Sequence, residues 1–267
     1  MIAELEYAPG RTGDICLPDT PAPGKGYPAV LLIHGGGWTS MERSAVAGIA
    51  EFLCGEGFAV FNIDYRLAPE DPWPRGFEDC KTALEYLTGP MAEKFPLDRE
   101  KVFVVGGSSG GHYALLTGLS AAPGSVAGIV SISGIADVFP DHERLPGRYE
   151  KLFGFPPTRE DLKKIDAREF YHGGAPPILC THYRYDAVVP FDSARNFAAE
   201  VERRGGHIAV YSYDYGRRDQ GHAIWIPGTS YDLSRRTSRP AGSTPNEAHR
   251  KLYPDLEQVI LFFLRNV

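Results

Sequence analysis

A short glycine- and serine-rich segment near the middle of the chain constrains its fold more than any other feature. Residues 106–111 read GGSSGG, and they directly follow the apolar run VFVV at residues 102–105. Residues 114–116, which come soon after, are apolar and have the composition of a buried helix. Glycines suit a sharp turn because they reach backbone conformations and close approaches that side chains forbid. The sequence therefore predicts a strand, a tight turn and a helix here.

The pattern G-x-S-x-G, which is typical of a nucleophile elbow, occurs twice in this segment. One register is centred on Ser108 and the other, one position later, on Ser109. Since the predicted strand ends at Val105, Ser108 falls on the turn and is favoured as the nucleophile, while Ser109 begins the helix. A Walker-type phosphate-binding loop is disfavoured because no lysine follows the glycines. A glycine-rich turn without chemistry is the remaining alternative, which the rest of the sequence must decide.

Short apolar runs alternate with helical patterns along the whole chain. The runs lie at residues 29–33, 58–63, 102–105, 126–132, 178–181 and 208–213, and the helical patterns at 41–55, 77–87, 111–120, 192–204 and 252–264. Strands that are apolar throughout and alternate with helices indicate a mostly parallel sheet with helices on both faces. With residues 4–7 and 14–17 as an antiparallel edge, we expect an α/β fold of about eight strands. Residues 1–267 are expected to form a single catalytic domain.

Two segments do not fit the alternation. Residues 137–177 are rich in proline and aromatic residues and lie between two predicted strands, so a small cap insertion with a short helix near 159–165 is predicted. Residues 227–247 are polar, with many turn-forming residues, and are predicted to form a long loop near the active site. Loops of this length are uncommon in compact domains unless they serve a function. A plain surface excursion is the alternative for the second segment.

Charge, hydropathy and cysteine spacing argue against several classes of partner and site. The net charge of −6 argues against nucleic-acid and anionic-membrane partners. The start of the chain lacks the features of a signal peptide, and no apolar run approaches the ~20 residues needed to span a bilayer, so a cytoplasmic protein is expected. The four cysteines are scattered and never form C-x-x-C, so neither a disulfide framework nor a metal site is expected.

A serine nucleophile needs a base to remove its proton and an acid to orient that base. Asp186 follows the predicted strand at 178–181, and His222 follows the one at 208–213, so both lie at the carboxyl edge of the sheet with Ser108. Their order after the serine is also that of α/β-hydrolase triads. Asp137 is the rival acid. The rival histidines are less well placed by order or by segment: His142, His172, His182 and His207.

A second glycine-rich turn supplies backbone donors. Residues 34–38 read HGGGW and directly follow the predicted strand at 29–33. Consecutive glycines can direct backbone N–H groups to one point, so this turn together with the N–H of Ser109 is predicted to form an oxyanion hole. A turn without chemistry is the alternative.

These motifs together resemble those of α/β-hydrolases, near the hormone-sensitive-lipase-like and acetyl-esterase branches. The resemblance is carried by HGGGW at 34–38, DYRLAPE at 64–70, PWP at 72–74, FED at 77–79, the elbow, Asp186, and Gly221-His222. Two departures favour a compact acetyl- or feruloyl-esterase-like protein. The elbow has Gly107 and Ser109 where the first branch has Asp and Ala, and HGGGW begins too early for the longer N-terminal cap of that branch.

The resemblance implies a cofactor-free Ser-His-Asp hydrolase that acts on small-molecule esters through an acyl-enzyme, with the N–H groups of Gly36, Gly37 and Ser109 as its oxyanion donors. Short-chain acyl groups are expected because the sequence has no long apolar lid or extended hydrophobic stripe. Carbohydrate-linked acyl groups are a further hypothesis, based on the aromatic and polar residues at 139–171 and 225–231. Trp38 and Trp225 are expected to contact the substrate. Two alternatives stay open. One is an amide-cleaving hydrolase, either a prolyl-oligopeptidase-type peptidase or an arylformamidase. The other is a non-catalytic binding module on the same fold. The sequence does not indicate the oligomeric state.

Overall fold

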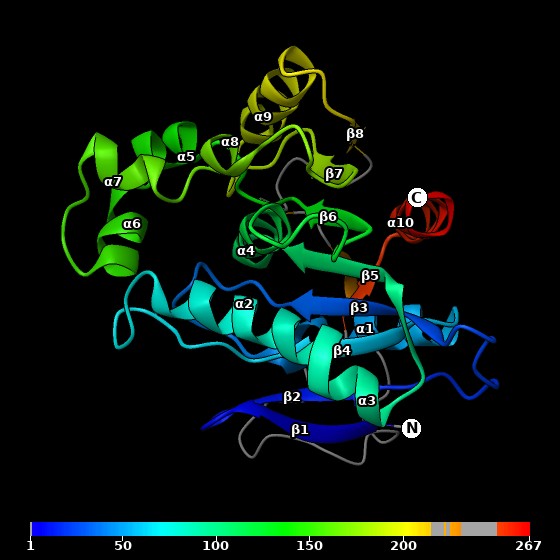
Figure 1. Ribbon diagram of the computed structural model, residues 1–267. Coiled ribbons are helices and arrows are strands. Elements are labelled where there is room, and N and C mark those ends of the chain that lie inside the picture. The colour runs from blue at the N-terminus through cyan, green and yellow to red at the C-terminus, as the bar shows by residue number, and fades with distance from the viewer. Residues whose placement is uncertain (1, 215–221, 223–224, 231–249) are drawn as a thin grey trace.

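A central eight-stranded sheet organises the molecule (Figure 1). The computed structural model describes residues 2–214, 222, 225–230 and 250–267. The strand order is β1-β2-β4-β3-β5-β6-β7-β8. The strands are β1 (Ile2–Ala8), β2 (Arg11–Cys16), β3 (Tyr27–Ile33), β4 (Ala59–Ile63), β5 (Leu97–Gly107), β6 (Gly128–Ile132), β7 (Ile178–Tyr183) and β8 (Ile208–Tyr213). All neighbouring pairs are parallel except β1 with β2 and β2 with β4. The predicted α/β fold with an antiparallel edge is confirmed.

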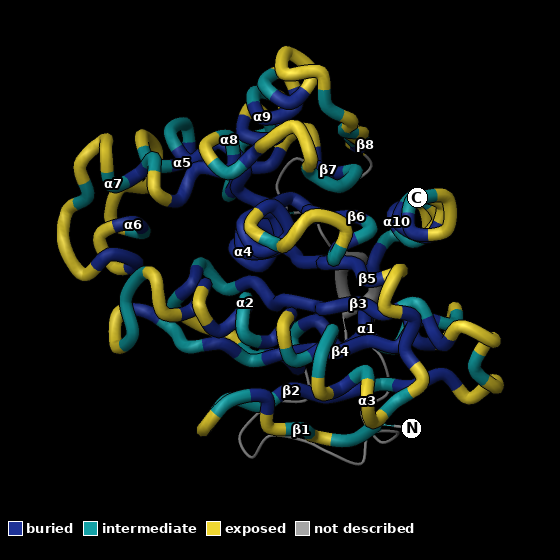
Figure 2. Tube along the Cα trace, in the orientation of Figure 1, coloured by how far each residue is buried: buried dark blue, intermediate teal, exposed yellow. Residues whose placement is uncertain are grey.

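The central strands are buried on both faces, which explains why their sequences read as continuous apolar runs. Successive residues of β3 face opposite ways, so Val30 and Leu32 pack into one core while Leu31 and Ile33 pack into the other. Helices α1 (Ala47–Gly55) and α10 (Pro254–Asn266) cover the first face. Helices α2 (Arg75–Tyr86), α4 (Ser109–Leu119) and α9 (Phe191–Arg203) cover the second. Figure 2 shows the central strands, such as β3, β4 and β6, as buried, while the edge strands β1 and β8 are more exposed.

Outside the insertion between β6 and β7, the remaining elements are short. They are η1 (Arg43–Val46), η2 (Leu87–Met91), α3 (Ala92–Lys94), and a two-stranded pair of β9 (Trp225–Ser230) with β10 (Arg250–Leu252). The predicted long loop at 227–247 therefore begins inside β9, and its residues 231–247 lie outside the described residues. Within the described part of the chain, no helix is long and apolar enough to cross a bilayer.

Four short helices lie between β6 and β7, where the sequence predicts a cap insertion with one short helix. They are α5 (Val138–Arg144), α6 (Pro146–Phe153), α7 (Arg159–Lys163) and α8 (Ala167–Phe170), and they project from one end of the sheet (Figure 1). Three of them begin at a side-chain cap: Asp137 caps α5, Thr158 caps α7 and Asp166 caps α8. Such caps satisfy backbone N–H groups that a helix leaves unpaired at its start. The insertion is therefore more regular than its sequence suggests.

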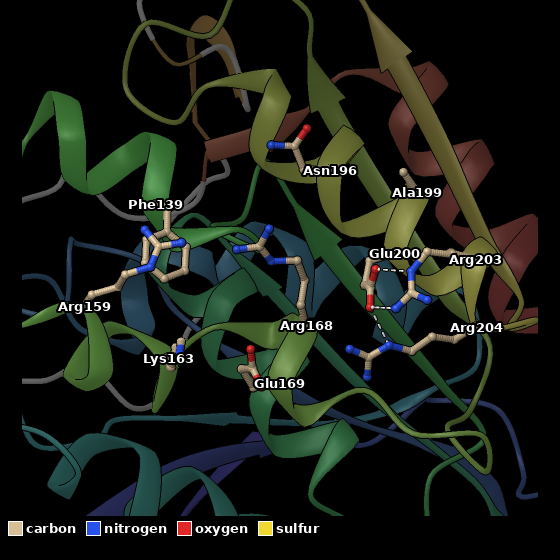
Figure 3. Close-up of a pocket in the computed structure, with 10 residues that line it drawn as sticks. All are labelled: Phe139, Arg159, Lys163, Arg168, Glu169, Asn196, Ala199, Glu200, Arg203 and Arg204. Carbon is tan, nitrogen blue, oxygen red and sulfur yellow. Dashed lines mark hydrogen bonds and ion pairs between the residues drawn. The ribbon is translucent and has the colours of Figure 1, made fainter.

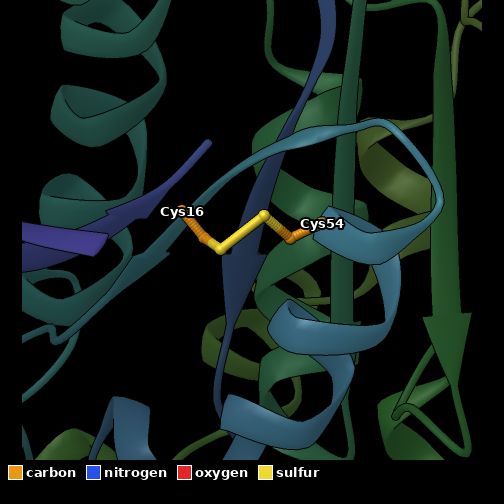
Figure 4. The surroundings of a disulfide bond; sticks show 2 residues. All are labelled: Cys16 and Cys54. Carbon is orange, nitrogen blue, oxygen red and sulfur yellow. A yellow bond between two sulfur atoms is a disulfide. The ribbon is translucent and has the colours of Figure 1, made fainter. Parts of the chain in front are cut away.

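One expectation about the cysteines is wrong. Cys16 at the end of β2 and Cys54 in α1 form a disulfide, with Cα atoms 6.2 Å apart (Figure 4). The two residues are 38 positions apart in the sequence, and their spacing carries no signal of pairing. They meet because α1 leads into β4, and β2 pairs with β4 at the same place, Cys16 lying opposite Val60. Cys80 and Cys180 are buried and free.

Candidate active site

Ser108 occupies the strained turn between β5 and α4. Its backbone has φ 57° and ψ −125°, a conformation that residues with a side chain rarely adopt. Its N–H donates a hydrogen bond of 2.9 Å to the carbonyl of Ile132, at the end of the neighbouring strand β6. Ser109 is the first residue of α4 and is fully buried. The backbone geometry of an elbow therefore belongs to Ser108, while Ser109 contributes an N–H at the start of a helix, where the helix itself offers no acceptor.

Glycines in the elbow are required by close packing of backbone on backbone. A Cβ atom on Gly110 would collide with the carbonyl oxygens of Ile33 and His34, and one on Gly106 would collide with the carbonyl of Gly110. The first turn of α4 therefore lies directly against the end of β3. This contact brings the serine turn beside the second glycine-rich turn, which starts at His34.

The HGGGW turn lies against Ser108. A Cβ on Gly35 would come within 2.9 Å of the carbonyl oxygen of Gly107 and within 3.1 Å of the Ser108 Cβ. Gly36 has φ +114° and Gly37 has φ +61°, both in the left-handed region. A Cβ on Gly36 would also collide with the carbonyl of Ser40, so this position admits no side chain. The predicted donors therefore belong to a turn that packs on the elbow.

Asp186 and His222 form a hydrogen-bonded pair. The distance from His222 Nδ1 to Asp186 Oδ2 is 2.6 Å, and the Asp186 side chain is fully buried. The other carboxylate oxygen accepts the N–H groups of Val188 and Val189 at 2.9 and 2.8 Å. Since a carboxylate only accepts, His222 donates through Nδ1 and keeps Nε2 as the basic nitrogen. Nε2 has no hydrogen-bond partner among the described residues.

The rival acid is occupied elsewhere. Asp137 caps α5, forms an ion pair with Arg168 at 2.7 Å, and accepts from Asn196 at 2.9 Å. His182, one of the rival histidines, is buried and lies 3.9 Å from Asp186, with its Nε2 directed at the carbonyl of Val189. Burial lowers the pKa of His182, so its ring is neutral at ordinary pH. These contacts occupy Asp137 within the insertion and place His182 beside the carboxylate of Asp186.

Residues of the DYRLAPE and FED motifs support the HGGGW turn. Tyr65 stacks on the His34 ring with centroids 4.3 Å apart, and its hydroxyl donates to the His34 carbonyl at 3.0 Å. Arg66 forms two side-chain hydrogen bonds with Asp79, of 2.8 and 2.7 Å. Bidentate pairs of this kind fix geometry as well as charge. Tyr65 therefore holds the start of the turn directly, and the pair of Arg66 with Asp79 joins the two motifs to each other, roles that the sequence alone did not show.

Of the two tryptophans expected to contact the substrate, Trp38 alone has a side chain that the structure describes. Trp38 is fully buried, with its ring packed between His112 and Tyr149. Trp225 begins β9, and its side chain lies outside the part that the structure describes.

A surface groove of about 470 Å³ lies between α7, α8 and α9 (Figure 3). None of the predicted site residues lines it. Its lining includes Phe139, Asn196 and Ala199 and the charged residues Arg159, Lys163, Arg168, Glu169, Glu200, Arg203 and Arg204. Most of the cations are already paired: Arg203 and Arg204 with Glu200, Arg168 with Asp137 and Asp166, and Lys163 with Glu160. Arg159 rests on the Phe139 ring at 4.4 Å. The groove is therefore a charge-balanced surface separate from the candidate active site.

Known proteins resemble this chain in both sequence and fold. The family model BD-FAE matches residues 14–201. Esterase LipC of Mycobacterium tuberculosis (strain ATCC 25618 / H37Rv) is 30% identical over 89% of this chain and 62% of its own length. The probable carboxylic ester hydrolase LipM of the same strain is 27% identical, over 69% of this chain and 47% of its own length. The chain thus spans about half to two thirds of these relatives.

Two solved structures share the fold. A truncated carbohydrate esterase from gut microbiota superposes with a TM-score of 0.71 at 23% identity, covering 82% of this chain and 88% of its own. An acetyl ester-xyloside bifunctional hydrolase from Caldicellulosiruptor lactoaceticus superposes with a TM-score of 0.70 at 20% identity, with the same coverage.

Proposed function

Because the chain belongs to the BD-FAE family of α/β-hydrolases, we propose that it is a serine carboxylic-ester hydrolase with Ser108, Asp186 and His222 as its triad. The observation that carries the proposal is the 2.6 Å hydrogen bond between His222 Nδ1 and the buried carboxylate of Asp186. Asp186 follows β7 and Ser108 follows β5, so both residues lie at the same edge of the parallel sheet. That edge is where ligands bind in open α/β sheets.

The proposed reaction proceeds through an acyl-enzyme. Ser108 Oγ attacks the ester carbonyl while His222 Nε2 takes its proton, and Asp186 stabilises the imidazolium that forms. The oxyanion binds the N–H groups of Gly36, Gly37 and Ser109, each of which contributes about 10²–10³ to the rate. His222 then protonates the leaving alcohol. A water molecule, deprotonated by His222, attacks the acyl-enzyme and releases the acid, which restores Ser108. No cofactor takes part.

The proposed substrates are small esters with short acyl chains. The relatives are named as esterases, and two structural neighbours carry the names carbohydrate esterase and acetyl ester-xyloside hydrolase. These names support acetyl esters, with carbohydrate-linked acyl groups as the finer hypothesis. Rates on p-nitrophenyl esters from acetyl to palmitoyl, and on acetylated sugars, test the proposal. A steady rise in rate towards palmitoyl would contradict it.

The proposal also covers the cap, the partners and the cellular location. The helices at 137–177 are proposed as a small cap of a single catalytic domain, and Trp225 as a substrate contact. No nucleic-acid or membrane partner is proposed. A cytoplasmic location stays a prediction against which the Cys16–Cys54 disulfide counts, because such bonds are rare in reducing compartments. Titration of free thiols in protein trapped from intact cells tests the location: four free thiols support the cytoplasm, and two contradict it.

The assignment of the nucleophile is tested by a matched pair of serine variants. Ser108→Ala is expected to lower kcat by about 10⁴–10⁶-fold, because the nucleophile is lost. Ser109→Ala keeps its backbone N–H and is expected to keep most of the activity. A fluorophosphonate probe should label the wild type and Ser109→Ala but not Ser108→Ala. The reverse pattern would move the nucleophile to Ser109, and no labelling of the wild type would favour a non-catalytic binding module.

Faster cleavage of aminoacyl amides or N-formylkynurenine than of esters would favour an amide-cleaving enzyme.

A further inference from the structure

We propose that His112 is a positioning residue of the active site, which fixes the HGGGW turn relative to Ser108 through a hydrogen bond to Trp38. The inference rests on the proposed function, because the turn that His112 holds is the one that would bind the oxyanion. His112 lies in α4, one helical turn after Ser108, and its side chain is fully buried.

The ring of His112 bonds at both nitrogens. Trp38 Nε1 donates to His112 Nδ1 at 3.3 Å, and His112 Nε2 lies 2.6 Å from the carbonyl oxygen of Ile165. A carbonyl oxygen only accepts hydrogen bonds, so Nε2 carries the proton of the neutral ring. Nδ1 is then left as an acceptor, which is what the indole N–H of Trp38 requires. The bond to Ile165, in the insertion between β6 and β7, thus sets the tautomer that holds Trp38.

Trp38 needs an anchor of this kind. It directly follows Gly36 and Gly37, and its backbone has φ +65°, a left-handed conformation that is strained for a residue with a large side chain. Its ring lies 5.3 Å from that of His112 and 5.4 Å from that of Tyr149, measured between centroids. These contacts hold the residue that ends the glycine turn, and so determine where the preceding N–H groups point.

The backbone of His112 completes the link. Its N–H donates a hydrogen bond of 3.1 Å to the carbonyl of Ser108. One residue therefore contacts the proposed nucleophile through its backbone and the oxyanion turn through its ring. The pKa of His112 is lowered to about 4 by burial, which keeps Nδ1 unprotonated at ordinary pH.

Two conservative substitutions separate the bonds at the two nitrogens. Asparagine places its amide oxygen near the position of Nδ1, so His112→Asn keeps an acceptor for Trp38 and loses the donor to Ile165. Glutamine places its amide nitrogen near Nε2, so His112→Gln keeps the donor to Ile165 and loses the acceptor for Trp38. Trp38→Phe removes the indole donor and keeps a ring in the same place.

The kinetic test compares kcat and KM on p-nitrophenyl acetate. His112→Gln and Trp38→Phe are expected to lower kcat about 10- to 100-fold with little change in KM, because small misplacements of reacting groups reduce rates by this order. His112→Asn should stay within about threefold of the wild type. The double variant Trp38→Phe/His112→Gln should lose no more than the worse single variant, since both remove the same bond.

Tyr27→Phe is the control for destabilisation away from the site. Tyr27 begins β3, at the opposite end of that strand from the HGGGW turn, and its hydroxyl donates a hydrogen bond to the carbonyl of Thr20. The melting temperature of this variant should fall while kcat stays unchanged. If Tyr27→Phe loses activity in proportion to its stability, as His112→Gln does, the role of His112 is structural and the proposal is overturned.

A second readout does not depend on turnover. The chain has three tryptophans, so ¹⁵N-labelled protein gives three indole N–H signals, and the Trp38 signal is the one that Trp38→Phe removes. This N–H should be protected from hydrogen exchange in the wild type and in His112→Asn, and unprotected in His112→Gln. Equal protection in all three would overturn the proposal, and so would kcat values for His112→Gln and Trp38→Phe within twofold of the wild type.

The two proposals fail in different ways. If the wild type hydrolyses no ester but a fluorophosphonate still labels Ser108, the rate of labelling replaces kcat, and the same order among the variants supports the role of His112. If the wild type shows neither turnover nor labelling, the proposed function fails, and the positioning role falls with it.

Discussion

Buried neutral histidines predict that the protein loses stability in mild acid. Burial lowers the pKa of His34, His112 and His182 in the folded chain. An unfolded chain titrates histidine near pH 6.5, so below that pH it binds protons that the folded chain excludes. When the unfolded state binds more protons than the folded state, the free energy of unfolding falls as pH decreases. The stability that the neutral rings contribute is therefore complete above about pH 6.5, and it is lost as pH falls towards the pKa values of the histidines in the folded protein.

The size of the effect follows from His112, whose pKa in the folded protein is about 4. Its ring faces the carbonyl of Ile165 and, farther off, the carboxylate of Asp166, which favour the charged form, and burial outweighs both. A difference of about 2.5 pH units between the unfolded and folded pKa corresponds to about 3 kcal/mol in the limit of low pH. At pH 5 the two titration curves give about 2 kcal/mol from this residue alone. His34 and His182 act in the same direction.

The assay is urea unfolding of the wild type and His112→Asn at pH 8, 6.5 and 5. The variant lacks the titrating ring, so its free energy of unfolding should fall by about 2 kcal/mol less than that of the wild type between pH 8 and 5. Burial raises the pKa of Asp137 and Asp141, which titrate with the opposite sign, but they are present in both proteins and cancel in the comparison. Parallel losses in the two proteins would refute the reasoning, because the ring would then be free to protonate in the folded state.

Two further predictions concern stability. Gly110→Ala should destabilise the protein by about 2 kcal/mol or more, because the new Cβ would collide with the carbonyls of Ile33 and His34. Gly147→Ala, at a helix position with nothing within 4 Å of the new Cβ, is its control and should be neutral or stabilising. Similar melting temperatures of the two variants would contradict this prediction. Reduction of the Cys16–Cys54 bond should cost about 4 kcal/mol in urea unfolding, given the 38-residue separation. Cys16→Ala/Cys54→Ala should not respond to reductant, and an unchanged midpoint for the reduced wild type would count against the bond.

The sheet could be predicted because its central strands are buried on both faces. Each of the five residues of β4, for example, is buried, and four of them are apolar. The exception is Asn62, whose side chain donates a hydrogen bond to the carbonyl of Arg43. The elbow could be predicted for a different reason. At Gly106 and Gly110 the backbone packs so closely on other backbone that only glycine fits, so the local sequence is enough to indicate the turn.

The sequence predicts the insertion and its helix α7, but the other three helices, α5, α6 and α8, could not be predicted from local pattern. The helices of the insertion span four to eight residues, too short for their propensity to stabilise them, and such helices depend on caps and on tertiary contacts. Arg168, for instance, joins the start of α8 to the start of α5 by pairing with Asp166 and Asp137. The disulfide escaped prediction likewise, because only the pairing of β2 with β4 brings Cys16 near Cys54.

Trp38 shows why a residue beside a predicted site is hard to interpret from sequence. A side chain that follows backbone donors can point towards a bound acyl group or back into the core, and the sequence HGGGW fits both. The direction is set by the left-handed backbone of Trp38 and by His112, which lies 74 residues away. The burial of His112 nevertheless indicates that it has hydrogen-bond partners. It is a polar residue in a fully buried helix, where an unpaired imidazole would cost free energy, so tertiary structure must supply its partners. A histidine buried one turn after a predicted nucleophile thus points to a bond with some neighbouring element, and the glycine turn is the neighbour that needs one.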